Sequence, residues 1–260
     1  MMTTQPTTDS SQETNAIPQG PYKRILLKLS GESLSGPHGL GIDPDRAHVI
    51  AKKIKAVYDL GVQMGIVIGA GNLWRGEIGI KRGMEQSTAD HMGMIATVMN
   101  GLALQDALQR IGVVTRVTTA VAMNAVAEPY IRLRAIRHME KGRVVIMTGG
   151  TGNPYFTTDT ASALRAMEID ADIIIKATKV NGIYTADPKK DPTAQRFTHL
   201  SYDQVLASRF NVMDLTAFTL CQENNMPILV LNFDSDGDLV EAAKGDTSVG
   251  TLVNHTGELL

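Results

Sequence analysis

The sequence of 260 residues has one cysteine, almost no net charge and no long apolar run. A single cysteine, Cys221, cannot form an intrachain disulfide, which favours a reducing compartment. A formal net charge of -2 provides no broad positive field for bulk nucleic-acid binding. Residues 1–20 lack the apolar core of a signal peptide and the arginines of a transit peptide. These absences predict a cytoplasmic protein with no membrane partner and a disordered tail over residues 1–20.

The sequence also lacks the motifs of several common enzyme classes. It contains no HExxH and no pair of cysteines or histidines at metal-ligand spacing, so a zinc site is not expected. The GxSxG motif of serine hydrolases does not occur in the sequence. Neither GxxxxGK[ST] nor the HRD and DFG pair of protein kinases occurs, so the motifs of the common phosphate-handling enzymes are absent.

The stretch from Arg143 to Pro188 contains two short apolar runs, VVIM and IIIK, each the length of a buried parallel strand. The first is followed by GGTGNPYFTTD, whose bare backbone N–H groups and hydroxyls suit an anion and whose Asp159 is the expected helix N-cap. The second is followed by ATKVNGIYTADP, in which Tyr184 can stack on a base. Ligands of open α/β sheets bind beyond the carboxyl ends of the strands, so both loops are expected to meet over one crevice.

The rest of the chain alternates apolar runs with helical periodicity, which predicts an α/β fold with a mainly parallel sheet. Arg75 to Gln86 lacks helical periodicity. The following helix has a Met-rich stripe of Met92, Ile95, Met99 and Leu102, which is more typical of a core than of an interface but is long enough to be a candidate for both. The expected strands are 22–29, 62–69, 113–119, 227–233 and a terminal edge strand at 251–253. The expected helices are about 44–60, 87–110, 128–142, 212–222 and 236–244, with a polar connector at 189–200.

Three glycine-containing loops, SGES, GAGNLWRG and GGTGNPYFTTD, follow expected strands, with Lys28 and Arg75 among them. Backbone donors and fixed cations suit the task of bringing two anionic phosphates together. A phosphate acceptor has a second pKa of about 6 and needs no general base, which fits a site poor in histidine. GAGNLWRG also resembles a dinucleotide-binding GxGxxG, but Trp74 stands where the third glycine is required for close packing.

Position alone leaves two interpretations open for several polar residues. Lys28 either reaches to a sheet edge or points its charge into the crevice. Asp90 either caps a helix or accepts a hydrogen bond from a ligand hydroxyl, and Asp214 is either a plain N-cap or a site residue. A basic helix either contacts an anionic effector or, more commonly, forms a solvated face; its residues are Arg132, Arg134, Arg137, His138 and Lys141.

Several segments together resemble the bacterial uridylate (UMP) kinases of the amino acid kinase family, over about residues 21–254. They are KLSGES, IVIGAGNLWRG, ADHMGMIATVMNGLALQDAL, GTGNPYFTTDTAS, IIIKATKVNGIYTADP, VMDLTAFTLC and PILVLNF. ATKVNGIYTADP is shared with aspartate kinases, whereas GTGNPYFTTD with DHMGM is specific to the UMP kinases. The resemblance implies a three-layer α/β/α sandwich around a twisted sheet, in a single domain over residues 21–260. It further implies a nucleoside monophosphate half at about 21–160 and an ATP half at about 161–260.

The resemblance implies transfer of the γ-phosphoryl group of Mg-ATP to UMP, giving UDP, in a homohexamer that GTP activates and UTP inhibits. It assigns catalysis to Lys28, Arg75, Asp159 and Asp214, with Mg2+ held mainly through the nucleotide phosphates. It assigns ATP binding to Lys28, Leu29, Ser30, Gly31, Gly71, Arg75, Thr178, Lys179, Tyr184 and Asp187. It assigns UMP binding to Gly69, Ala70, Asp90, Thr151, Gly152, Asn153, Pro154, Tyr155, Phe156, Thr157 and Thr158. It assigns effector binding to Gly36, Pro37, His38, Gly39, Leu40, Gly41, Arg116 and Arg143.

The sequence departs from the family pattern in two places. Ala70 stands where glycine is usual, which would cost about 1 to 3 kcal/mol if the backbone there had a positive φ. Gln105 and Gln109 stand where some relatives place basic residues, which bears on the strength of GTP activation. Two other functions stay open: a family member acting on a carboxylate or carbamate, and a non-catalytic sensor of UMP or UTP. The presence of Lys28, Arg75 and both aspartates argues against the sensor.

Overall fold

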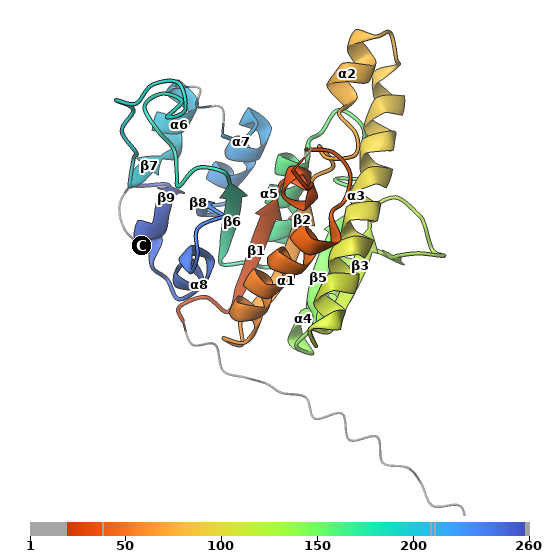
Figure 1. Ribbon diagram of the computed structural model, residues 1–260. Coiled ribbons are helices and arrows are strands. Elements are labelled where there is room, and N and C mark those ends of the chain that lie inside the picture. The colour runs from red at the N-terminus through yellow and green to blue at the C-terminus, as the bar shows by residue number, and fades with distance from the viewer. Residues whose placement is uncertain (1–19, 38, 209, 211, 258–260) are drawn as a thin grey trace, which may run out of the picture.

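The computed structural model describes residues 20–37, 39–208, 210 and 212–257 (Figure 1). The tail predicted over residues 1–20 therefore lies, except for Gly20, outside the described residues, as does the effector candidate His38. The centre is one nine-stranded sheet in the order β4-β3-β5-β2-β1-β6-β8-β9-β7. The strands are β1 Arg24–Leu29, β2 Gln63–Ile68, β3 Thr115–Thr119, β4 Glu128–Pro129, β5 Val144–Thr148, β6 Ile173–Thr178, β7 His199–Ser201, β8 Ile228–Asn232 and β9 Gly250–Asn254.

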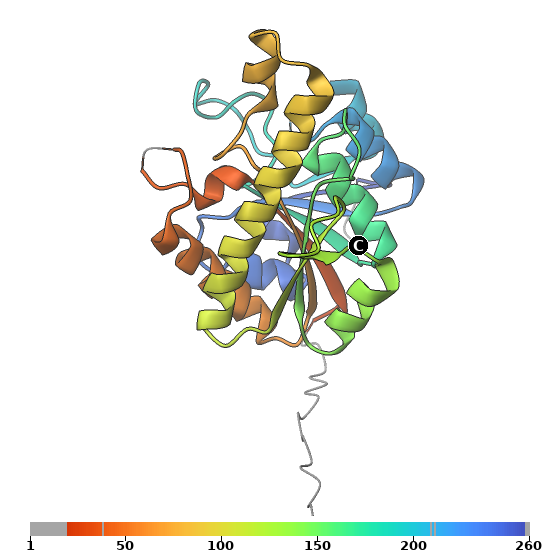
Figure 2. The same ribbon diagram turned by 90° about the vertical axis from the view of Figure 1, so that its right-hand side faces the viewer.

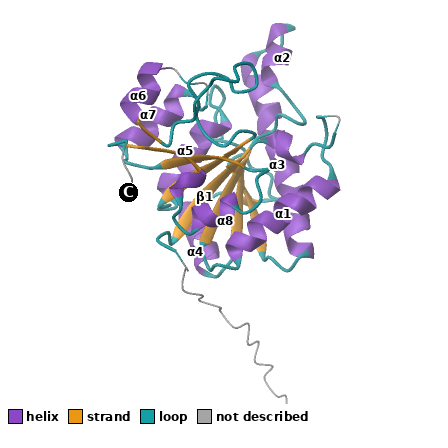
Figure 3. Cartoon of the chain, turned by 60° about the vertical axis from the view of Figure 1, so that its left-hand side comes forward, coloured by secondary structure: helices purple, strands orange, loops and turns teal. Residues whose placement is uncertain are grey.

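Helices cover both faces of this sheet, which confirms the expected α/β sandwich (Figure 3). One apolar core lies between the sheet and α1, α3 and α8, and a second lies between the sheet and α4 to α7. The helices are α1 Pro44–Tyr58, α2 Gly76–Lys81, α3 Gln86–Arg110, α4 Arg132–Glu140, α5 Thr158–Glu168, α6 Tyr202–Ser208, α7 Leu215–Glu223 and α8 Asp238–Ala243, with 3-10 turns η1 Gly31–Leu34 and η2 Thr247–Val249. Among the described residues, no helix combines the length and apolar character that a membrane crossing requires.

The sheet is parallel except where β9 runs antiparallel to β8. The prediction that residues 251–253 form an edge strand is wrong, because β9 also pairs with β7 and lies inside the sheet. The edge is β7, within the segment expected to be a connector. Only Leu200 of its three residues is buried, so this strand carries no apolar alternation that a sequence pattern would detect.

Two further expectations about helices are wrong. Helix α2 forms where no periodicity was found, since a single turn and a half is too short to show one. The helix expected over 128–142 begins only at Arg132, because Glu128 and Pro129 form β4 beside β3. Three other helices begin as their N-cap residues predict: Asp43 caps α1, Asp214 caps α7, and at the start of α6 Ser201 and Gln204 exchange the two hydrogen bonds of a capping box.

Helix α3 runs along the whole domain, with α2 packed at its outer end (Figures 1 and 2). Three members of its Met-rich stripe are not core, because Met92, Ile95 and Met99 are 37%, 45% and 52% exposed, whereas Leu102 packs against the core. The buried face of α3 combines larger apolar residues such as Val98 and Leu104 with small ones such as Gly101. At Gly101 a Cβ would lie only 2.6 Å from Thr148 Cγ2, so only glycine permits this approach of α3 to β5.

Candidate active site

Two lysines lie side by side near the carboxyl ends of neighbouring strands. Lys28 of β1 and Lys176 of β6 are paired in the register of the sheet, and both are buried, at 8% and 6% exposure. Residues 24, 26 and 28 of β1 share one face, so Lys28 points to the same side as Leu26, toward α5. This favours the second interpretation of Lys28, a charge held at the crevice.

Asp159, in the first turn of α5, bridges the two lysines. Its Oδ1 lies 2.5 Å from Lys28 Nζ and its Oδ2 lies 2.6 Å from Lys176 Nζ. The prediction that Asp159 is the N-cap of this helix is wrong, because the Thr157 hydroxyl accepts from the N–H groups of Asp159 and Thr160 instead. A helix N-terminus favours a carboxylate, so α5 presents Asp159 between the two ammonium groups.

The charges of this group are strongly coupled. Burial, followed by the field of Lys28, lowers the pKa of Lys176 to about 8. Burial by itself would raise the pKa of Asp159, but the two ammonium groups more than offset it, so this pKa lies below its ordinary value. Each ammonium has three N–H donors, and the described contacts use one on each lysine. Donors therefore remain for an anion.

Asp214 lies beside this group and not within it. It caps α7 by accepting from the N–H of Ala217, as one interpretation of the sequence expected. It also accepts from the hydroxyls of Thr157 and Thr160, at the start of α5. Asp214 thus ties the beginning of α7 to the beginning of α5, and its charge reaches Lys176 only through space.

The first two glycine loops are packed against each other under the lysines. A Cβ at Gly31 would lie 2.5 Å from both the Gly69 carbonyl oxygen and Asn72 Oδ1, so the contact requires glycine. Asn72 and Asn100 of α3 are buried and exchange two side-chain hydrogen bonds of 3.0 and 2.8 Å. Asn100 also donates to the Gly69 carbonyl at 2.8 Å, so α3 fixes the loop that contains Gly69 and Ala70.

A cavity of about 280 Å³ opens between α3 and the third glycine loop. From the predicted UMP set it is lined by Ala70, Asp90, Thr151, Phe156, Thr157 and Thr158, and from the rest of the chain by Trp74, Gly76, Ala89, Gly93, Met94, Thr97 and Gly150. The lining does not include Gly69, Gly152, Asn153, Pro154 or Tyr155. A larger, mainly apolar hollow of about 660 Å³ adjoins it, and Thr151 and Phe156 line both.

Asp90 holds the third loop in place. Its carboxylate accepts from the N–H of Tyr155 at 2.8 Å, and Glu85, not Asp90, caps α3. Tyr155 has a φ of 72°, a left-handed conformation that this bond helps to maintain. The strain considered for Ala70 does not arise, because the described non-glycine residues with positive φ are Tyr155, Asp170 and Asn225.

The predicted ATP residues lie around Lys28 and on the loop after β6. Arg75 NH2 lies 2.5 Å and Lys179 Nζ 3.3 Å from the carboxylate of Glu32, so one anion joins two predicted cations. Leu29 is buried, Ser30 caps η1, and Gly71 accepts from Arg75 at 3.2 Å. On the second loop, Thr178 donates to Val180, Tyr184 donates to Asn181, and Asp187 accepts from the N–H of Lys189.

The predicted effector residues fall into two groups. Arg116 and Arg143 are joined through Glu128 and His138, by contacts of 3.6 Å (Arg116 to Glu128), 3.1 Å (Glu128 to His138) and 3.0 Å (His138 to Arg143). Arg116 lines a cavity of about 340 Å³ together with Gln105 and Glu128. Loop 36–41 instead exchanges hydrogen bonds with Asn72 through Gly41, and none of the described contacts joins it to the arginines.

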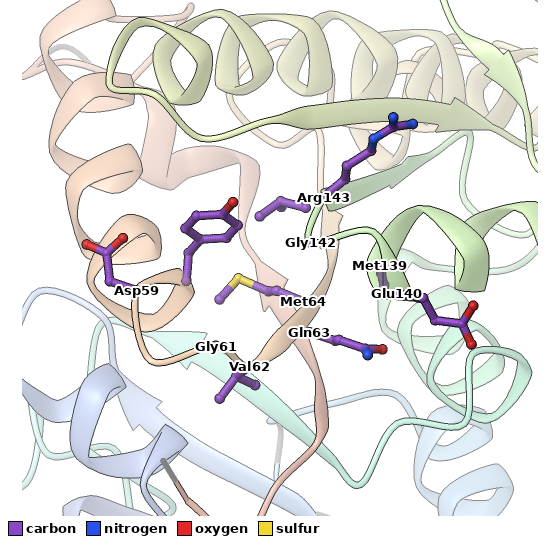
Figure 4. A pocket seen from close by; sticks show the side chains of 11 residues that line it. Asp59, Gly61, Val62, Gln63, Met64, Met139, Glu140, Gly142 and Arg143 are labelled. Carbon is purple, nitrogen blue, oxygen red and sulfur yellow. The ribbon is translucent and has the colours of Figure 1, made fainter. Parts of the chain in front are cut away.

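Arg143 also lines a separate cavity of about 230 Å³ at the opposite end of the sheet, below the starts of β2 and β5 (Figure 4). Tyr58, Met64 and Met139 form much of its wall, and Arg143 points away from Glu140. The polar groups around it are already engaged: Asp59 with Lys55, Gln63 with Arg24, and Arg143 with His138. The anion-binding features therefore gather at the carboxyl ends of the strands.

Two site residues were not found from the sequence, Lys176 and Glu32. For Lys176 a signal exists, because ILLK and IIIK place a lysine after three buried residues in the two strands that turn out to be neighbours. For Glu32 the sequence offers no signal, since the carboxylate acquires its role only where the loops after β1, β2 and β6 meet.

Comparisons with known proteins agree with this geometry. Residues 23–232 match the model of the amino acid kinase family. The chain is similar to a UMP kinase from Bacillus anthracis (40% identity, TM-score 0.87, 91% of this chain and 97% of that chain). It is also similar to a UMP kinase from Ureaplasma parvum (36%, TM-score 0.82, 89% and 98%) and a uridylate kinase from Archaeoglobus fulgidus (30%, TM-score 0.69, 88% and 99%).

The fold, the lysine pair between glycine loops and these matches define a kinase, an enzyme that transfers a phosphoryl group. The chain belongs to the amino acid kinase family.

Proposed function

We propose that the protein is a UMP kinase that transfers the γ-phosphoryl group of ATP to UMP, giving UDP and ADP. A phosphate oxygen of UMP attacks the γ-phosphorus, and the bond from that phosphorus to the bridging oxygen of ADP breaks. The observation that carries the proposal is the Lys28–Asp159–Lys176 group. Its Asp159 directly follows Thr157 and Thr158, which line the cavity of Asp90 and Phe156. The similarity to three UMP kinases supports the choice of acceptor.

In this proposal the protein works by positioning and by neutralising charge. Lys28 and Lys176 stabilise the transferred phosphoryl group, and Asp159 keeps both lysines in place. Arg75 and Lys179 exchange Glu32 for the donor phosphates, and Tyr184 and Asp187 lie beside the donor nucleoside. Asp90 and the loop 151–158 hold UMP. No general base is needed, because the acceptor phosphate is ionised at neutral pH.

Magnesium fits this site as a partner of the nucleotide. The described residues contain no group of three or more His, Cys, Asp or Glu that would hold a metal ion by themselves. Asp159 is engaged by two lysines, and Asp214 by two hydroxyls and a backbone N–H, so neither carboxylate is free. Mg2+ would therefore be held mainly by the phosphates, with Asp159 and Asp214 nearby, and would supply neutralisation of the phosphate charge.

We extend the proposal to organisation and control. Residues 21–160 would form the monophosphate half and 161–260 the ATP half of one domain, acting in the cytoplasm in pyrimidine nucleotide synthesis. The exposed stripe of Met92, Ile95 and Met99 supports a contact with another copy of the chain, in line with a homohexamer. GTP would activate and UTP would inhibit, with Arg116 and Arg143 as candidate phosphate ligands.

The test is ADP release from Mg-ATP with UMP, CMP, dTMP, aspartate and carbamate offered separately, each with and without GTP. Turnover confined to UMP is expected, and a change with GTP would establish an effector site. Turnover with aspartate or carbamate would assign a different reaction within the family. Binding of UMP or UTP without any turnover would identify a sensor and refute the proposed enzyme.

A further inference from the structure

Arg165 is a buried cation to which the proposed reaction gives no part. It lies on α5, one turn from the end of the helix, and its side chain is 6% exposed. Its NH1 donates to Glu168 Oε2 at 2.6 Å, and its NH2 donates to the Gly150 carbonyl oxygen at 3.2 Å. Its guanidinium carbon lies 4.0 Å from the centre of the Tyr130 ring. Two hydrogen bonds and one stacked face therefore hold this planar group.

Gly150 is the entry to the acceptor loop, residues 151–158. Gly149 and Gly150 both have left-handed backbones, with φ of 76° and 60°, so the loop turns sharply where it leaves β5. The N–H of Gly149 donates to the Thr97 hydroxyl at 2.8 Å, from α3. From α5, Arg165 donates to the carbonyl oxygen of the following loop residue, Gly150. The turn is thus held from both sides of the crevice, and Arg165 supplies the only side-chain contact described for the Gly150 carbonyl.

This cluster is costly to bury. Replacing a buried ion pair by apolar groups of similar volume is often neutral or stabilising, so the charge of Arg165 is weak support for stability. Tyr130 belongs to the same buried cluster, because its ring lies against the Arg165 guanidinium. Burial, together with Glu168, raises the pKa of Tyr130. A costly arrangement aimed at a two-glycine turn indicates control of loop geometry.

We infer that Arg165, stacked on Tyr130 and paired with Glu168, is a positioning residue that fixes the Gly150 carbonyl and so sets the acceptor loop for the acceptor nucleotide. Arg165 does not touch the substrate and acts through residues 151–158. The inference rests on the proposed function for the identity of the acceptor. Its physical content, that Arg165 orders this loop, holds for any acceptor bound there.

The test compares Arg165→Met with Arg132→Met. Both changes remove a guanidinium that pairs with a carboxylate, but Arg132 pairs with Asp170 on the surface, whereas the side chain of Arg165 is buried. In Arg165→Met we expect KM for UMP to rise about tenfold, the effect of losing one hydrogen bond to a charged group, while KM for ATP stays within about twofold. Backbone amide exchange of residues 149–157 should accelerate in the same variant. Arg132→Met should change neither quantity.

Arg165→Lys separates positioning from a merely structural role. Lysine keeps the charge but cannot reach Glu168 and Gly150 together as a planar fork. KM for UMP in Arg165→Lys should therefore lie between the values of the wild type and of Arg165→Met. Unchanged KM for UMP and unchanged loop exchange in Arg165→Met, or in Arg165→Lys if the first variant does not fold, would overturn the inference. If the wild type turns out not to use UMP, the proposed function fails, and loop exchange still decides whether Arg165 orders the loop.

Discussion

The two ends of strand β1 each hold a buried cation, and they satisfy it in opposite ways. Arg24 and Lys28 lie on the same face of the strand, at 5% and 8% exposure. Arg24 gives two hydrogen bonds to Gln63 Oε1, at 2.9 and 2.6 Å, and one to the Ile169 carbonyl oxygen. Among the described residues, Lys28 pairs with Asp159 alone and shares it with a second cation, Lys176.

This difference separates a structural polar cluster from a binding site. At the start of the strand, fixed oxygen atoms meet the donors of Arg24, and burial, partly offset by Asp170, Glu140 and Asp172, lowers its pKa. Near the end of the strand, two ammonium groups share one carboxylate and keep donors in reserve. A cation that donates to fixed neutral oxygen atoms stabilises the fold, whereas two ammonium groups that share one carboxylate keep a net positive charge that attracts an anion. Five predictions test this contrast between the two ends of β1.

The largest expected effect is that of Lys28→Ala. Loss of one charged donor to the transferred group should lower kcat about 10³-fold, because that donor acts where charge develops in the reaction. Circular dichroism and the midpoint of thermal unfolding should show a folded protein. Lys55→Ala, which removes an exposed lysine paired with Asp59, is the control and should keep full activity. Turnover like that of the wild type in Lys28→Ala would remove Lys28 from the mechanism.

The next effect is that of Asp159→Asn. An amide cannot balance two ammonium groups at this depth, so one lysine should lose its proton and kcat should fall about tenfold to 100-fold at pH 7.5. Activity should recover partly as the pH is lowered.

The matched control for Asp159→Asn is Asp172→Asn, at the other end of the sheet. There the carboxylate accepts from the backbone N–H groups of Lys23 and Arg24, at 2.7 and 2.8 Å. The Asp172→Asn change should lower the stability of the fold and leave kcat per folded molecule within about twofold of the wild type. If both variants lose activity equally, the proposed distinction between the two ends is wrong.

A smaller effect is the alkaline limit of activity. Because the pKa of Lys176 is lowered to about 8, kcat/KM for ATP should fall as the pH rises above 8. Bound phosphate favours the charged lysine, so the limit of kcat should lie at higher pH. Lys176→Arg should remove this limit, since a guanidinium stays protonated. A pH profile of the wild type that is flat to pH 9.5 would contradict the assignment.

Stability should follow the opposite trend in the same range. The unfolded chain keeps a lysine pKa of 10.5 while the folded protein has about 8 for Lys176. Between these values the unfolded state binds more protons, so the contribution of Lys176 to stability increases as the pH rises from 8 to 10.5. Opposite slopes of activity and of stability are therefore expected, and urea unfolding at a series of pH values measures the second slope.

Local patterns were sufficient for most of the fold and for the glycine loops. Apolar runs and N-cap residues identified the inner strands, the long helix α3 and the parallel order of the sheet. The family motifs also named Lys28 and Asp159. What failed depends on contacts between distant segments. Strands β4 and β7 are two and three residues long and are defined only by their neighbours, β3 and β9.

The same limit explains what was missed in the site. Lys176 follows an apolar run just as Lys28 does, and a lysine at that position looks alike whether it reaches the surface or faces a partner. Only the register that places Lys28 beside Lys176 decides this. Asp159 was expected to cap α5, but Thr157 takes that role and leaves the carboxylate to the two lysines. The pairing of Lys28 with Lys176 and the position of Asp159 between them both depend on contacts between distant segments, which the sequence alone does not give.

The smallest expected effect is that of Gln63→Leu, which tests the Arg24 cluster at the start of β1. Gln63→Leu removes the acceptor of two Arg24 hydrogen bonds and leaves buried N–H donors without partners, which should lower the free energy of unfolding by about 1.5 to 3 kcal/mol. Gln222→Leu, which removes a surface hydrogen bond to Asp203, should cost less than about 0.5 kcal/mol. In both variants kcat and KM per folded molecule should match the wild type, because Arg24 is satisfied by the fold and Lys28 is not. A fall in kcat with Gln63→Leu would mean that the two cations of β1 are coupled through the strand, and that their separation into a structural cluster and a binding site does not hold.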